Sequence, residues 1–75
     1  MKISARNVLS GKVVSITKDS FNAEVTVKVG PKTNVVSVIT LEALQRLEIA
    51  KGSEVYAVIE ATDVLLGIPH HKRGE

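Results

Sequence analysis

Apolar and polar residues alternate strictly through residues 22–29, which gives the clearest strand signal in the chain. One side of this stretch carries Ala23, Val25, Val27 and Val29. Valine-rich stretches at 9–18 and 35–39 predict a strand on either side of it, and Gly11 predicts a bulge, a bend or a close backbone approach in the first. Turn-forming residues at 19–20 and 30–34 separate the three stretches. The pattern therefore predicts three consecutive strands, with a hairpin between the second and third.

The hydrophobic period changes at Thr40. Leu41, Leu44 and Leu47 recur every three residues, which predicts a helix of about two turns with one stripe facing the core. Thr40 is a good helix N-cap, because its hydroxyl can accept a hydrogen bond from a backbone N–H two or three positions later. The helix is expected to end before the turn signal at 51–52.

Two further strands are predicted after the helix, at 53–61 and 62–68, with Pro69 ending the last one. The remaining tail, 69–75, includes His70 and His71, has no apolar residue after Pro69, and is expected to be flexible. Three strands, a short helix and two strands predict an all-β fold, a five-stranded OB-like barrel with its helix between the third and fourth strands.

The chain has 75 residues, and 44% of them are hydrophobic, so one small domain over 1–68 is expected. A domain of this size buries only about 60% of its unfolded surface, so small domains often need a disulfide, a metal or association. There is no cysteine, and the mean hydropathy is positive at +0.16. We therefore expect a homo-oligomer that shares apolar surface between its subunits.

Several classes of function are disfavoured. No nucleophile, histidine and acid are placed to form a catalytic set, so we predict that the protein is not an enzyme. His70 and His71 lack the further ligands that a metal site needs. Phe21 and Tyr56 are the only aromatic residues, which argues against binding of single-stranded nucleic acid. No apolar run is long enough to span a membrane and no leader pattern is present, so a cytoplasmic location is expected.

A small inorganic oxyanion fits the composition better, because such a ligand needs hydroxyls, one or two cations and backbone N–H groups. The net charge is only +2, but Ser4 and Arg6 lie two residues apart and share a side if this stretch is extended. The helix start at Thr40 is expected to add a hydroxyl and free amides. Lys12 has two interpretations, a further cation of the site or a surface lysine whose stem covers apolar residues.

Several short motifs occur together in this chain: Ile3-Ser4-Ala5-Arg6-Asn7, then Leu9, Gly11-Lys12-Val13, Asn22-Ala23-Glu24-Val25, Ile39-Thr40, Gly52 with Val55, and Ala61-Thr62 with Val64. Together they resemble the molbindins, which are single-Mop-domain molybdate-binding proteins. The resemblance implies an OB-like barrel that assembles as a homo-hexamer, a trimer of strand-sharing dimers. It also implies molybdate or tungstate bound between subunits for storage and homeostasis of the metal, with oxyanion contacts at Ser4, Arg6 and Thr40.

Two positions depart from the pattern of that family. Ala43 stands where a hydroxyl residue is common, and Glu60 stands where many members have a lysine. A carboxylate near a dianion is repelled, so Glu60 either points away, is compensated by a cation such as Lys12 of a neighbouring chain, or weakens the site. The alternative hypotheses are therefore a structural or interaction module with weakened ligand binding and, less favoured, an OB-type nucleic-acid binder.

Overall fold

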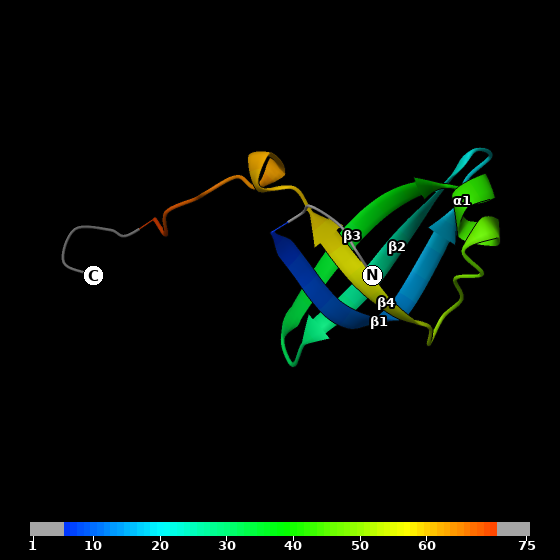
Figure 1. Ribbon diagram of the computed structural model, residues 1–75, viewed down its shortest axis with the longest axis horizontal. Coiled ribbons are helices and arrows are strands. Elements are labelled where there is room, and N and C mark those ends of the chain that lie inside the picture. The colour runs from blue at the N-terminus through cyan, green and yellow to red at the C-terminus, as the bar shows by residue number, and fades with distance from the viewer. Residues whose placement is uncertain (1–5, 71–75) are drawn as a thin grey trace.

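The computed structural model describes residues 6–70 and contains one antiparallel sheet, one short α-helix and a 3₁₀ turn (Figure 1). The elements in chain order are β1 (Asn7–Lys18), β2 (Asn22–Gly30), β3 (Thr33–Thr40), α1 (Leu41–Arg46), β4 (Glu54–Ile59) and the 3₁₀ turn Ala61–Asp63. The first three predicted strands, the helix and the fourth strand are confirmed, with boundaries shifted by up to two residues.

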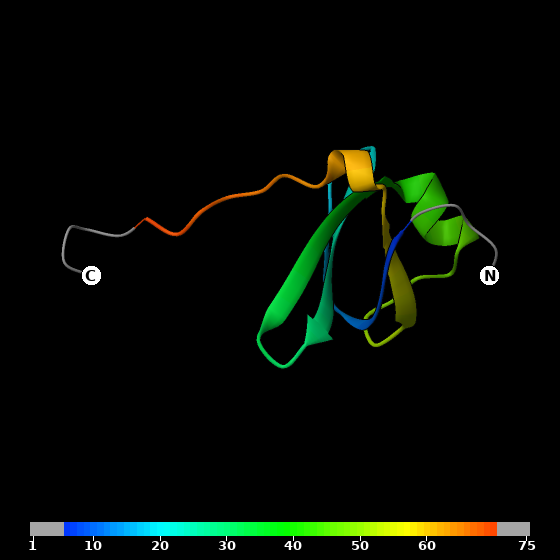
Figure 2. The same ribbon diagram turned by 60° about the vertical axis from the view of Figure 1, so that its left-hand side comes forward.

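The four strands follow the order β3-β2-β1-β4, and every neighbouring pair is antiparallel. β1 lies in the centre and is long enough to pair with β4 along its first half and with β2 along its second. The sheet is strongly curled, as Figures 1 and 2 show, so its apolar side becomes concave. β3 and β4 remain the two edges, and the described chain does not close into a barrel.

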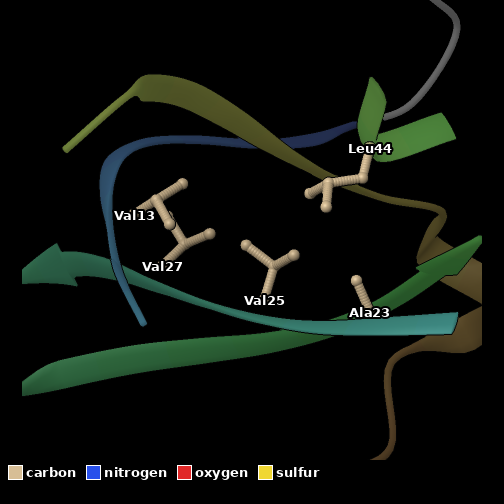
Figure 3. Close-up of a cluster of buried hydrophobic side chains, with 5 residues drawn as sticks. All are labelled: Val13, Ala23, Val25, Val27 and Leu44. Carbon is tan, nitrogen blue, oxygen red and sulfur yellow. The ribbon is translucent and has the colours of Figure 1, made fainter. Parts of the chain in front are cut away.

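The core fills the concave side of the sheet and consists of Val13, Ala23, Val25, Val27 and Leu44 (Figure 3). Three of these come from β2 and are at most 4% exposed, so the strand face predicted from alternation is confirmed. Leu44 reaches down from α1 onto the same side, also with 4% exposure. A core this small leaves much apolar surface uncovered.

β1 keeps its apolar residues on the concave side by means of a bulge between Val13 and Ser15. Val13 pairs with Val27 and Ile16 pairs with Val25, so two core-facing positions are three residues apart rather than two. Gly11 lies just before this bend, and a Cβ added there would come within 2.5 Å of a Val27 methyl and 2.6 Å of the Lys28 carbonyl oxygen. Gly11 is therefore needed for the close approach of β1 to β2, as the sequence predicted.

Replacing Gly11 with alanine is expected to lower the free energy of unfolding by about 2 kcal/mol, because overpacking against a backbone carbonyl cannot be relieved by a side-chain rotation. Gly30→Ala is the matched control, since a Cβ there meets only Thr33, at an ordinary contact distance of 3.7 Å. Chemical denaturation of both variants measures the difference. Equal stability of the two variants would contradict this account of the bend.

The turn between β1 and β2 is held by Asp19. Its Oδ1 accepts hydrogen bonds from the N–H groups of Phe21 at 2.8 Å and Asn22 at 2.7 Å. These two hydrogen bonds favour the ionised carboxylate, so they lower the pKa of Asp19 from its ordinary value. The predicted turn at 19–20 is therefore confirmed. It reverses the chain, so that β2 pairs antiparallel with β1.

Helix α1 begins as predicted, with Thr40 as N-cap. The hydroxyl of Thr40 accepts a hydrogen bond from the N–H of Ala43 at 3.0 Å. The predicted stripe is only partly right, because Leu44 is buried and Leu41 packs against the core, whereas Leu47 is 60% exposed. The helix ends at Arg46, so Leu47 falls in its C-cap, outside the buried core.

The predicted fifth strand, 62–68, is wrong for the single chain. Residues 61–63 form the 3₁₀ turn, and residues 64–70 have no regular structure and extend away from the sheet in Figures 1 and 2. A strand requires a neighbouring backbone to pair with, and among residues 6–70 this segment pairs with none. The five-stranded barrel is therefore corrected to a curled four-stranded sheet with a projecting C-terminal arm.

Candidate functional site

Of the predicted oxyanion ligands, the three that the structure describes, Arg6, Lys12 and Thr40, do not come together within one chain. Ser4 lies outside the described residues. Arg6 precedes β1 at the end of the sheet where Asn7 pairs with Ile59, and Thr40 pairs with Asn22 at the other end, next to the end of β1 (Figure 1). A site that includes both Arg6 and Thr40 consequently requires two chains.

Arg6 is exposed, and it directly precedes the first residue of β1. A guanidinium in this position keeps its five donors available to a planar or tetrahedral anion. The nearest described strand end is that of β4, which finishes at Ile59. Arg6 and the segment that follows β4 therefore form one end of the sheet.

Thr40 is also exposed, and its hydroxyl already accepts the N–H of Ala43. Its own O–H remains a donor that can point at an anion, so capping and ligand binding are compatible. The expectation of free amides at this helix start is only partly met, because the N–H of Leu41 donates to the Phe21 carbonyl at 2.9 Å. Thr40 therefore offers an anion a hydroxyl more readily than a set of amides.

Lys12 lies in the middle of β1, directly opposite Lys28 on β2 and Glu54 on β4. All three are exposed, and together with Ser10 and Tyr56 they line a shallow depression on the outer side of the sheet. This position is separate from both Arg6 and Thr40 in the same chain. Lys12 can therefore join them only from a neighbouring subunit.

The two departures from the molbindin pattern occupy defined positions. Ala43 lies in the first turn of α1, where its N–H donates a hydrogen bond to the hydroxyl of Thr40. Its side chain has no donor for a ligand. Glu60 follows β4 and is the N-cap residue of the 3₁₀ turn, but its side chain makes no capping hydrogen bond. The exposed carboxylate of Glu60 is therefore not engaged by the turn that it begins.

One feature that the sequence interpretation missed is an apolar groove of ≈ 350 Å³ between the two edge strands. Its walls include Val35, Val36 and Ile39 of β3 and Val55, Tyr56 and Ile59 of β4. The C-terminal arm has complementary character, with Leu65 92%, Leu66 94% and Ile68 91% exposed. The sequence contained a sign of this feature, because residues 64–68 form an apolar run. That run was assigned to a fifth strand that closes the barrel within one chain.

Neither a metal centre nor a membrane segment is found in the part of the chain that the structure describes. Residues 6–70 contain no group of three His, Cys, Asp or Glu side chains placed to hold a metal ion. No helix within the same range has the length and apolar character needed to cross a bilayer.

The TOBE domain family model matches residues 3–66. The chain belongs to the TOBE-domain family. Relatives matched over nearly their full length show that this chain falls in the branch of single-domain Mop proteins, the molbindins. The probable molybdenum-pterin-binding protein of Haemophilus influenzae is 47% identical over 68 residues, which cover 91% of this chain and 99% of the relative.

Solved structures of Mop proteins agree with the fold of this TOBE domain. MopII from Clostridium pasteurianum superposes with a TM-score of 0.83 at 37% identity, covering 89% of this chain and all of that one. A molybdate-bound structure of the cytoplasmic molybdate-binding protein ModG gives a TM-score of 0.87 at 40% identity, covering 92% of this chain and 49% of ModG. The curled sheet with one short helix is therefore an OB-like Mop domain.

Proposed function

We propose that this Mop domain binds molybdate or tungstate between the subunits of a homo-oligomer, without chemical conversion, and serves intracellular storage and homeostasis of the metal. The oligomer is a hexamer, a trimer of strand-sharing dimers, located in the cytoplasm. The oxyanion contacts are Arg6 and Ser4 from one chain and Thr40 from another, with Lys12 as a further cation. The ligand class is supported by full-length and structural relatives that are described as binding molybdenum-pterin or molybdate.

The observation that carries the between-subunit site is the separation of Arg6 from Thr40 in one chain. Each residue is exposed at its own end of the sheet. Arg6 forms no ion pair with another described side chain. A dianion held by a guanidinium at one end and a hydroxyl at the other needs two copies placed end to end. Association thereby completes a site that a single chain leaves in halves.

Strand sharing is supported by the match between the apolar groove and the C-terminal arm. The groove lies between the unpaired edges of β3 and β4, which offer backbone hydrogen-bonding groups as well as apolar walls. An extended arm from a second copy can pair with these edges and bury Leu66 and Ile68 between them. The exchange supplies the fifth strand of the barrel in trans and removes both exposed edges.

The proposed chemistry consists of charge and donor geometry alone. Arg6 supplies a forked cation, and the hydroxyls of Ser4 and Thr40 donate to oxygens of a tetrahedral dianion. A set of donors fixed by two rigid sheets has a preferred spacing, so it favours the larger molybdate and tungstate over sulfate.

A second candidate is a structural module that assembles in the same way but binds oxyanions weakly. The observation that favours it is the pair of departures, since Ala43 provides no side-chain donor and Glu60 brings a negative charge. Loss of one hydrogen bond costs about 1 kcal/mol, whereas a carboxylate beside a dianion costs more at close range.

Isothermal titration calorimetry with molybdate, tungstate and sulfate separates the two candidates. The oxyanion-binding proposal predicts saturable binding of molybdate and tungstate and at least about tenfold weaker binding of sulfate, a difference of about 1.4 kcal/mol. Equal binding of all three anions, or heat from none of them, would contradict it. A stable oligomer without binding would support the structural module.

A further inference from the structure

The register of β1 and β4 places Glu60 at the same end of the two strands as Arg6. Asn7 pairs with Ile59 and Val8 with Val58, and the same register continues to Lys12 and Glu54. Arg6 directly precedes Asn7 and Glu60 directly follows Ile59, so the two residues flank the last pair at this end of the two strands. An anion that binds at Arg6 therefore lies within reach of the carboxylate of Glu60.

The carboxylate of Glu60 is not occupied by the local structure. Its side chain does not cap the 3₁₀ turn that follows, where the backbone carbonyl of Glu60 instead accepts the N–H of Asp63 at 2.9 Å. An ionised carboxylate can accept hydrogen bonds but cannot donate them. It therefore repels an oxyanion that has no proton, and it can accept a hydrogen bond from an oxyanion that carries one.

We propose that Glu60 is a selectivity-determining residue of the Arg6 site, which favours oxyanions that carry a proton at neutral pH, such as hydrogen phosphate and hydrogen arsenate, relative to bare dianions such as molybdate, tungstate and sulfate. This inference rests on the proposed oxyanion site at Arg6. The guanidinium attracts both classes of anion, and the carboxylate of Glu60 distinguishes between them. Glu60 thus lowers the advantage that molybdate has at a site of this kind.

The test compares the full chain with its Glu60→Gln variant by calorimetry near neutral pH, with molybdate and hydrogen phosphate as the two probes. Glutamine has the shape of glutamate, but its amide can donate to a bare dianion as well as accept from a protonated one. The ratio of molybdate affinity to hydrogen phosphate affinity is expected to rise by at least about tenfold in Glu60→Gln, as for a gained hydrogen bond to a charged group. A change of less than about twofold in this ratio would overturn the inference.

Glu24→Gln is the matched control, because it removes the same charge from an exposed position on β2 that faces Thr17 and Val38. The control is expected to leave the ratio unchanged, and an equal rise in both variants would show only a general charge effect and overturn the inference.

Arg6→Ala separates failure of the inference from failure of the proposed function. If Arg6→Ala abolishes binding while Glu60→Gln leaves the ratio unchanged, the site stands and the role of Glu60 is refuted. If neither anion binds to the wild-type chain or to Glu60→Gln, or if Arg6→Ala binds both normally, the proposed site itself is refuted and the role of Glu60 with it.

Discussion

Arg6→Ala is expected to lower the affinity for molybdate by at least about a hundredfold, because it removes the guanidinium that one chain contributes to the proposed site. The fold should be unaffected, since Arg6 is exposed and precedes the first strand. Calorimetry with molybdate measures the loss, and size-exclusion chromatography checks that the oligomer persists.

Lys32→Ala provides the matched control for the loss of one positive charge. Lys32 is exposed in the turn between β2 and β3, away from both proposed halves of the site. Its replacement should leave the molybdate affinity within about twofold of wild type, as is usual for a distant surface charge. If Arg6→Ala binds as tightly as Lys32→Ala, the assignment of Arg6 is wrong.

Leu66→Asp is expected to weaken dimer formation by about a thousandfold or more. In a strand-sharing dimer, two copies of Leu66 are buried, and each contributes roughly 2–3 kcal/mol of apolar burial. An unpaired carboxylate in the groove adds a desolvation penalty to that loss. Analytical ultracentrifugation over a range of protein concentrations measures the change.

Leu65→Asp tests whether the arm enters the groove as a strand. Alternation in an extended segment puts Val64, Leu66 and Ile68 on one side and Leu65 on the other. Leu65 and Leu66 are about equally exposed in the single chain, at 92% and 94%, so a different response must come from the assembly. Leu65→Asp should weaken dimer formation much less than Leu66→Asp does. An equal effect of both variants would argue against strand pairing by the arm.

The sheet could be predicted from sequence where local pattern and packing agree. The alternation of Ala23, Val25 and Val27 specified both the strand and its buried face, and Thr40 marked the helix start through a single side-chain hydrogen bond. These features depend on residues close together in the chain, so a local pattern contains the information needed to predict them.

The fifth strand could not be placed because strand formation depends on a partner. Residues 64–68 have an apolar character suited to a strand, but in one chain they do not pair with the free edge of β3 or β4 and remain exposed. The same argument applies to Leu47, which has the spacing of a core-facing helix position but falls in the C-cap of α1 and stays 60% exposed. Local pattern predicts the tendency of a segment, whereas long-range pairing decides its state.

The candidate site shows the same difference between local sequence pattern and long-range pairing. The residue types at Arg6, Thr40 and Lys12 indicated an oxyanion, but their separation in space could be learned only from the strand register. The relation of Glu60 to Arg6 likewise follows from the pairing of β1 with β4 rather than from their distance in sequence. The placement of these residues is the reason why we propose a site shared by two chains.

Mixing two binding-deficient variants tests the between-subunit site most directly. Arg6→Ala removes one half of the site, and Thr40→Asp repels the dianion from the other half while keeping a good N-cap residue. If the halves come from different chains, co-assembly of equal amounts should restore about one quarter of the wild-type molybdate sites, because residue 6 and residue 40 are each intact with even odds. If each variant alone fails to bind and the co-refolded mixture also binds no molybdate, the two residues do not meet across subunits and the account is contradicted.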